Sequence, residues 1–453
     1  MRFFSRVVIL LFLFRTYRIL ATHERNLNSH SLLPEQVHLA YAGKLSDTET
    51  FTGALGLPSK MSITWITFAD THRSFVRYGR DGKLDHSVKA TICKFTDGGK
   101  ARTVRYVHRA LIQDIRAGQQ YYYRVGSKYG WSSMFKFRGL KERSSGGFVY
   151  AIYGDFGFEK ARSLSKLNRY ARAGVYDMII HNGDIAYDMD KHNGTVGDKF
   201  MRQIEPMSTR IPYMVSAGNH ERTYNYSHYK ERFTMPGTNH NLYYSFNLGA
   251  AHFVTINSEA YYTLDFGKTP IKTQWNWLVK DLKEANKNRN KVPWIIMYVH
   301  NRMYCTDIST HQCSRARDVM RDGFAPTNKY GLEKLIFDNN VDLFIGAHEH
   351  NYERFWPIYK FNVLNGTTNW RNAYENAPAP IHLTTGSAGS YEPLNRFSKK
   401  IAAHSAFRSS NFGFTKMHVY NSTHVHIQQI AANKHVAEDD FWIVKHKQQK
   451  HSH

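Results

Sequence analysis

Residues 148–157 read Phe-Val-Tyr-Ala-Ile-Tyr-Gly-Asp-Phe-Gly, an unbroken apolar run that ends in glycine and aspartate. A short continuous apolar run bounded by turn residues is typical of a strand buried on both faces, as in a parallel sheet. Gly154 lets the backbone turn sharply after the strand, so the short side chain of Asp155 can reach beyond the strand's carboxyl end. The segment therefore predicts an α/β domain with a polar group at the edge of its sheet.

Four later apolar runs, at residues 178–181, 211–217, 294–299 and 341–345, end in the same way. The segments that follow them are Gly183-Asp184-Ile185-Ala186-Tyr187-Asp188, Gly218-Asn219-His220-Glu221, His300 and Gly346-Ala347-His348-Glu349-His350. Helical patterns lie between some of the runs, as at Leu164-Leu167-Tyr170-Ala171 and Trp275-Leu278-Leu282. Because ligands bind beyond the carboxyl ends of strands in open α/β sheets, these strand ends together predict one shared metal site.

Each of these segments has a simpler interpretation when it is taken alone. A Gly-Asp pair after a strand is more often a turn than a ligand, and a lone His300 would usually be a buried histidine with ordinary hydrogen bonds. The Asp155-Phe156-Gly157 triplet is also found in protein kinases, but no His-Arg-Asp catalytic loop and no glycine-rich phosphate loop accompany it. The succession of such strand ends in one domain favours the metal site.

The residue types in these segments indicate which metals would bind. Carboxylate, amide, imidazole and phenolate side chains form a hard ligand set, and a phenolate from Tyr187 favours a ferric ion. No cysteine belongs to the set, so the set does not favour a structural zinc site. Two neighbouring ions suit displacement at phosphorus, since one holds the nucleophile while the other polarises the ester.

The charge of the chain restricts its partners. The 453 residues include 61 Lys and Arg against 37 Asp and Glu, which gives a net charge of +24. A basic surface favours nucleic acid, an anionic membrane or a phosphorylated substrate, although scattered cations also fit a merely solvated surface. No basic helix and no platform of mixed aromatic and basic residues is visible in the sequence, so no specific nucleic-acid partner is predicted.

The pattern changes along the chain and indicates separate domains. Residues 33–140 contain alternating apolar and polar stretches, as at Met61–Thr67, residues 75–78 and residues 121–125, with turns between them, which predicts a β-sandwich. A linker of charged residues, serine and glycine at 141–147 leads into a catalytic domain at 147–435, and residues 436–453 are interpreted as a basic tail.

The N-terminus and the cysteines indicate an exported chain. Residues 1–21 are interpreted as a signal peptide, with Arg2 and Arg6 before a short apolar run that is too short to span a bilayer. Cys305 and Cys313 are candidates for a disulfide, and Cys93 is left over as a buried thiol. Glycosylation sequons occur at Asn193, Asn225, Asn365 and Asn421. A secreted or endo-lysosomal glycoprotein is expected, with its oligomeric state, a homodimer included, left open.

Taken together, the five metal segments resemble the motifs of purple acid phosphatases, in the animal branch with plant-like architecture. The stretches His300-Asn301-Arg302-Met303-Tyr304-Cys305, Tyr330–Leu335 and Ala347–Arg354 are similar to that branch as well. The resemblance implies a fibronectin-III-like domain followed by a four-layer α/β/β/α metallophosphoesterase domain. It also implies that Asp155, Tyr187 and His350 hold a ferric ion and that Asp184 bridges. Asn219, His300 and His348 would hold a second, divalent ion, which is zinc, iron or manganese.

The implied activity is hydrolysis of phosphate monoesters at acid pH, by attack of a metal-bound hydroxide, on small esters or phosphorylated proteins. His220 is the candidate catalytic residue at the rim, and His311 is a weaker one. Asn301-Arg302 stand where family members commonly have Arg-Pro, so the pocket wall is expected to differ. Two alternatives stay open: a phosphodiesterase or nucleotide pyrophosphatase on the same metal core, and a secreted binding protein that retains the metal site.

Overall fold

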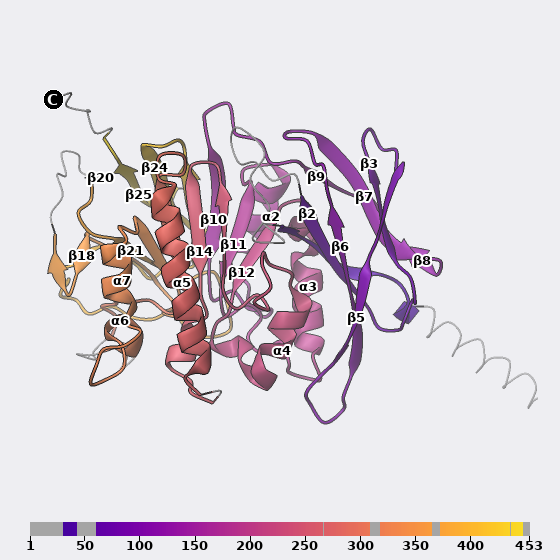
Figure 1. Cartoon of the computed structure of the whole chain (residues 1–453), viewed down its shortest axis with the longest axis horizontal. Coiled ribbons are helices and arrows are strands. Elements are labelled where there is room, and N and C mark those ends of the chain that lie inside the picture. The colour runs from indigo at the N-terminus through magenta and orange to yellow at the C-terminus, as the bar shows by residue number, and fades with distance from the viewer. Residues whose placement is uncertain are drawn as a thin grey trace, which may run out of the picture.

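The computed structural model describes residues 30–42, 60–265, 267–308, 318–364, 372–434 and 436–446. The predicted signal peptide at 1–21, the weak candidate His311 and the sequon residue Asn365 lie outside these ranges. Among the described residues, no helix has the length and apolar character needed to cross a bilayer. Figure 1 shows strands of the N-terminal domain at one end of the molecule and helices α5 (Thr269–Lys287) and α7 (Leu332–Asp338) toward the other.

The N-terminal domain consists of two antiparallel sheets. One has the order β1 (Glu35–Tyr41), β2 (Met61–Thr67), β6 (Val104–Ile112), β5 (Thr91–Thr96). The other has the order β4 (His86–Lys89), β3 (Phe75–Gly79), β7 (Gln120–Ser127), β8 (Gly130–Trp131), with β9 (Phe135–Arg138) paired to β7. The predicted N-terminal β-rich domain is thereby confirmed, while its likeness to a fibronectin type III module stays a prediction.

Strand β2 is buried along its whole length, although its sequence alternates between apolar and polar residues. Its apolar residues, such as Ile63 and Trp65, pack in the core of the N-terminal domain. Its other face lies toward the second domain, where the Thr64 hydroxyl lies 2.9 Å from that of Thr234. Thr64 is therefore at an interface between domains and not in water.

The second domain contains two seven-stranded sheets. The first has the order β12 (Tyr213–Ser216), β11 (Met178–Asn182), β10 (Phe148–Tyr153), β23 (Gly413–Val419), β24 (His424–Ala431), β25 (Ala437–Val444), β20 (Ala373–Glu375). The second has the order β13 (Tyr244–Leu248), β14 (Ala251–Thr255), β15 (Trp294–Tyr298), β16 (Leu343–Gly346), β21 (Ile381–Thr385), β17 (Tyr352–Phe355), β22 (Ser405–Ser409). Strands β10, β11 and β12 are parallel, as are β14, β15, β16 and β21.

The two sheets pack face to face, with helices on the outside. Tyr150 of β10 packs on Phe253 of β14 in the layer between the sheets, with ring centroids 4.8 Å apart. On the other face of the first sheet, His181 of β11 contacts Phe200 of α3 (Thr195–Ser208), and α2 (Leu164–Arg172) packs beside α3. Val254, the neighbour of Phe253, packs instead with Leu278 of α5. This alternation along β14 confirms the predicted order of layers, α/β/β/α.

Shorter elements complete the second domain. They are α4 (Thr223–Arg232), α6 (Val319–Asp322), the 3-10 turns at Asn219–Glu221 and Ser258–Tyr261, and a hairpin of β18 (Ile358–Tyr359) and β19 (Asn362–Val363).

Two predictions about the chain were wrong. The basic tail was placed at 436–453, but β25 pairs with β24 and β20 inside the first sheet, so the domain extends to Val444. The first half of the strand contains three acidic residues, and its apolar half, residues 441–444, is followed at once by the basic end of the chain. Cys93 is exposed on β5 and not a buried thiol. Cys305 is disulfide-bonded, and its predicted partner, Cys313, lies outside the described residues.

Candidate metal centre

The five strand ends singled out in the sequence meet at the edge where the parallel strands of both sheets have their carboxyl ends. Strands β10, β11 and β12 of the first sheet and β15 and β16 of the second all end there, because the strands within each set are parallel. All the predicted ligand side chains converge at this edge, and they do so in two groups.

The first group joins Asp155, Tyr187 and His350. The Tyr187 hydroxyl lies 2.7 Å from His350 Nε2 and 3.3 Å from Asp155 Oδ1. Asp155 Oδ1 is also 3.3 Å from His350 Nε2. The carboxylate, the phenol and the imidazole thus aim their donor atoms at one small volume.

The second group is arranged around His300. Its Nε2 atom lies 3.1 Å from Asp184 Oδ2, 3.2 Å from Asn219 Oδ1 and 3.2 Å from His348 Nδ1. Asp184, His300 and His348 have ligand atoms within 4.8 Å of one another, close enough to hold a single ion. The other ring nitrogen of His300 lies 3.0 Å from the carbonyl oxygen of Asn182, which fixes the orientation of the ring.

Several of these residues have a backbone conformation that side chains other than glycine rarely adopt. Asp155, Asp184, Tyr187 and His348 have φ between 48° and 68°, in the left-handed region. Such strain is concentrated at functional sites, where the surrounding structure holds it in place. Gly183 has φ 78°, and a Cβ atom there would lie 2.5 Å from His300 Nδ1, so only glycine fits.

Glu221 ties two of the ligand loops together. Its carboxylate accepts hydrogen bonds from the backbone N–H groups of Asp184 (2.9 Å), Ile185 (2.8 Å) and Gly218 (2.8 Å). The first two belong to the loop after β11 and the third to the loop after β12. Glu221 therefore positions Asp184 relative to Asn219.

A buried ion pair explains the unusual Asn301-Arg302 sequence. Arg302 lies 2.7 Å from Glu349, which stands between the predicted ligands His348 and His350. The Arg302 side chain also donates a 2.7 Å hydrogen bond to Asn301 Oδ1, and Asn301 donates one of 2.7 Å to Glu259. This network holds the His348–His350 turn in place, and the expected difference of the pocket wall from the family pattern stays a prediction.

His220 stands at the rim of the site, as predicted, beside two carboxylates that sequence analysis missed. Its Nδ1 lies 2.8 Å from Asp188 Oδ1, and its Nε2 lies 3.8 Å from Glu392 Oε1. Glu392 also lies 3.7 Å from His350 Nε2. Asp188 follows Tyr187 directly in the quoted motif. Glu392 lies in the loop after β21, whose sequence Ile-His-Leu-Thr-Thr is not a continuous apolar run, so the pattern of the other strand ends could not identify it.

The carboxylates control the protonation of the site. Burial by itself lowers the pKa of an imidazole, but Asp184 outweighs burial and holds the pKa of His300 well above its ordinary value. Against the same effect of burial, Asp155 raises the pKa of His350 to about 9. Burial and the charge of Asp155 raise the pKa of Tyr187 well above the ordinary value for a phenol. When only protein groups are considered, the negative charges of Asp155 and Asp184 are therefore balanced by the protonated imidazoles of His350 and His300.

The residues fit a pair of metal ions. Asp155 is 0% exposed and Asp184 is 2% exposed. Within the described ranges, neither carboxylate forms an ion pair with Lys or Arg. Buried carboxylates are costly without a cationic partner, and a metal ion supplies one while it displaces the protons of the histidines. Oxygen and nitrogen donors without cysteine suit hard or borderline cations.

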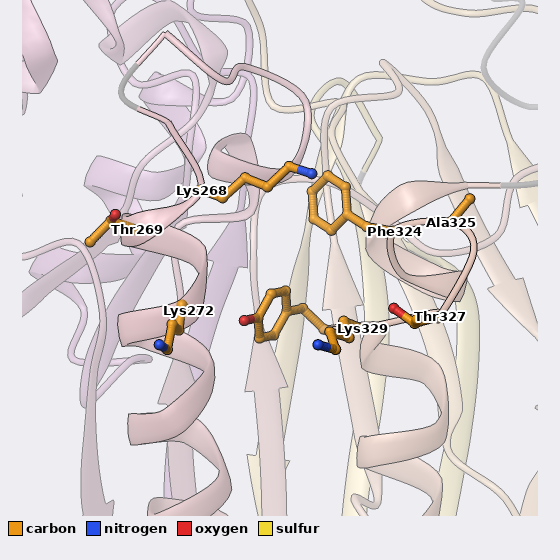
Figure 2. Close-up of a pocket in the computed structure, with 8 residues that line it drawn as sticks. Lys268, Thr269, Lys272, Phe324, Ala325, Thr327 and Lys329 are labelled. Atoms are coloured by element: carbon orange, nitrogen blue, oxygen red, sulfur yellow. The ribbon is translucent and has the colours of Figure 1, made fainter.

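A separate hollow of about 320 Å³ lies at the start of α5. Figure 2 shows Lys268 and Lys272 on the α5 side and Phe324 and Lys329 across from them. None of its lining residues belongs to the predicted site.

Comparison with known protein families shows which families the successive parts of the chain match. Three family models match in order: "Purple acid Phosphatase, N-terminal domain" at residues 34–139, "Calcineurin-like phosphoesterase" at 148–352, and "Iron/zinc purple acid phosphatase-like protein C" at 379–440. The last of these runs past residue 435 and agrees with the longer domain described above.

Relatives and solved structures agree with these matches. The chain is 41% identical to human acid phosphatase type 7 over 93% of both chains, and 30% identical to purple acid phosphatase 22 of Arabidopsis thaliana over 87% of this chain and 81% of that one. Its fold matches the purple acid phosphatase PPD1 from yellow lupin seeds, with a TM-score of 0.74 and 22% identity over 91% of this chain and 74% of that one. The chain belongs to the purple acid phosphatase family.

Proposed function

We propose that this protein is an acid phosphatase that hydrolyses phosphate monoesters at acid pH, at a dinuclear centre of one ferric and one divalent ion. The observation that carries the proposal is the separation of the predicted ligands into two donor groups. Asp155, Tyr187 and His350 would hold the ferric ion, since they include the phenol. Asn219, His300 and His348 would hold zinc, iron or manganese, with Asp184 shared between the two ions.

The protein groups around the site orient and polarise a phosphate ester. When bound, the metal ions supply Lewis-acid charge for the phosphoryl oxygens and lower the pKa of water. His220, held through Nδ1 by Asp188, presents its Nε2 to the rim, where it can donate a hydrogen bond to the phosphoryl group or a proton to the leaving oxygen. The backbone N–H of His220 also donates a 3.0 Å hydrogen bond to Asp184 Oδ1, which fixes the backbone of His220 relative to the shared ligand.

The substrate class is tested by comparing two esters. With the purified protein, kcat/KM on 4-nitrophenyl phosphate should exceed that on bis(4-nitrophenyl) phosphate by at least roughly tenfold, about 1.4 kcal/mol of transition-state binding. A monoester dianion can be held by both cations, whereas a diester offers one charge. Faster cleavage of the diester would favour a phosphodiesterase or nucleotide pyrophosphatase on the same core. No hydrolysis by metal-loaded protein would favour a binding protein.

The role of His220 is tested by the variant His220→Asn, which retains one hydrogen-bonding amide. We expect kcat to fall by roughly 10²-fold, the lower range for losing a group that transfers or donates a proton. The comparison variant is Glu392→Gln, which changes a carboxylate beside His220 and leaves the imidazole in place. A kcat for His220→Asn within about twofold of the wild type would rule out a catalytic role.

Export and glycosylation stay predictions that the exposed sequons support. Asn193, Asn225 and Asn421 are exposed. The disulfide at Cys305 is also usual in an oxidising compartment. Faster electrophoretic migration after glycosidase treatment of protein from secretory cells checks this, and unchanged migration would count against it.

A further inference from the structure

The five-stranded sheet of the N-terminal domain has an outer face that no other part of the described chain covers with a helix. Tyr121, Tyr123 and Val125 of β7 are buried in the core of the domain. Because side chains alternate along a strand, Tyr122 and Arg124 lie on the opposite face. Figure 1 shows β3, β7 and β8 at the end of the molecule, on the far side of the N-terminal domain from α5 and α7.

The strands of this outer face carry positive charge and no negative charge, and Asp85, in the turn before β4, places its carboxylate beside Gly79 at one end of the face. None of the five strands β3, β4, β7, β8 and β9 contains Asp or Glu. The pairing register places five cations on the outer face, and we call them the basic face: Arg77, Lys89, Arg124, Lys136 and Arg138. Within the described ranges, none of these five side chains forms an ion pair with a carboxylate.

Two of the arginines are held in a fixed position. Arg77 and Arg124 stand directly opposite each other on β3 and β7, an arrangement in which like charges repel. Both guanidinium groups pack on the Trp131 ring, at 4.7 and 4.9 Å from its centroid. Trp131 lies across Gly126, where a Cβ atom would come within 3.0 Å of the ring. The buried Nε of Arg124 has no hydrogen-bond partner in the described structure.

We propose that the basic face binds a linear sulfated polysaccharide. A repulsive pair of arginines without carboxylate partners is relieved by an anionic ligand, and the planar guanidinium group binds anionic oxygens through two hydrogen bonds at once. The row continues over β9, where Lys136 stands opposite Tyr122 and Arg138 opposite Gln120, so the cations repeat from strand to strand. A polymer with regularly spaced sulfate groups matches that repetition.

The same observations disfavour other polyanions. Single-stranded nucleic acid stacks its bases on free aromatic rings, but the Trp131 ring is already contacted by two guanidinium groups. A membrane-bound face would carry aliphatic side chains between its cations, and the outward positions of the five strands hold none. The uncharged residues that the register places there include Phe75, Ser87, Gln120, Tyr122 and Trp131. The choice of a sulfated glycan as the ligand rests on the export proposed above. The inference that the basic face binds a polyanion does not depend on export.

The test measures binding of a size-defined heparin oligosaccharide to the full chain by titration calorimetry at several salt concentrations. Arg77→Gln/Arg124→Gln should raise Kd roughly tenfold and lower the slope of log Kd against log salt by about one for each cation removed. Lys268→Gln/Lys272→Gln removes the same charge from the hollow in Figure 2 and should leave Kd within about twofold. Both variants should hydrolyse a small monoester at the wild-type rate, which shows that they are folded.

Three results would overturn the proposal. One is wild-type affinity in Arg77→Gln/Arg124→Gln, and another is an equal loss in the Lys268→Gln/Lys272→Gln control, which would mean that only net charge matters. The third is tighter binding of the wild type to a single-stranded oligonucleotide or to phosphatidylserine–phosphatidylcholine vesicles than to the oligosaccharide. If Arg77→Gln/Arg124→Gln does not fold, Lys136→Gln/Arg138→Gln serves instead and should weaken binding in the same way.

Discussion

Asp184→Asn should abolish most of the phosphatase activity, with a fall in kcat of roughly 10³-fold, the scale of losing a preorganised charged contact in an active site. Asp184 Oδ2 lies 3.1 Å from His300 Nε2, and Oδ1 accepts the His220 N–H. The amide keeps the shape of the side chain but removes the charge that balances two cations. We also expect the metal content of the purified variant to fall below two ions per chain.

The matched control is Asp190→Asn, which makes the same chemical change in the same loop. Asp190 is half-buried and is not among the predicted ligands. We expect its activity and metal content to stay close to those of the wild type. If Asp184→Asn kept both metal ions and full turnover, the assignment of Asp184 would be wrong.

Asp198→Asn should destabilise the whole chain by about 3–5 kcal/mol, because it leaves buried arginines without their carboxylate. Asp198 on α3 lies 2.6 Å from Arg105 of β6 and 2.8 Å from Arg232 at the end of α4. These three side chains are at most 4% exposed. The pair with Arg105 joins the N-terminal domain to the catalytic domain. The free energy of unfolding, measured in urea at pH 6, gives the value.

The control for Asp198→Asn is Asp338→Asn, which removes a surface carboxylate that pairs with Lys334 at 2.6 Å. Exposed ion pairs contribute little to stability because solvent screens them, so the free energy of unfolding should hardly change. An equally small loss for Asp198→Asn would show that the buried network does not stabilise the fold.

The effect of Asp198 depends on pH in a known direction. Burial opposes ionisation, but Arg105 and Arg232 outweigh it and lower the pKa of Asp198 from 3.8 to about 2. A carboxylate with a lowered pKa in the folded state stabilises the fold fully above pH 3.8 and loses this contribution as the pH falls toward 2. The difference in stability between wild type and Asp198→Asn should therefore narrow between these values, while it remains complete in mildly acidic solution.

The core strands of the catalytic domain could be predicted from the sequence because burial on both faces leaves a continuous apolar run. The predicted run at 148–153 coincides with β10, and the run at 294–299 exceeds β15 by one residue. The convergence of the proposed ligands could be predicted for the same reason, since each lies in the segment that follows such a run. Strand β25 was missed because its first half contains three acidic residues and its apolar half, residues 441–444, directly precedes the basic end of the chain.

Contacts between distant segments could not be predicted. Arg302 and Glu349 belong to different strand ends, and only the pairing of β15 with β16 brings them together. The basic face is assembled from Arg77 and Arg124, which are far apart in the sequence, so no cluster of charge is visible there. The sequence likewise carries no sign of the left-handed backbone at Asp155, because that conformation is imposed by the surrounding fold.

The most direct test of the central claim is the visible spectrum of the purified protein together with its metal content. If Tyr187 binds a ferric ion beside a divalent one, the wild type should contain two metal ions per chain and show a violet charge-transfer band. Tyr187→Phe should lose the band, since the phenolate is its source, while His350 and Asp155 remain as ligands. A colourless wild type with two zinc ions, or a band that persists in Tyr187→Phe, would contradict the account.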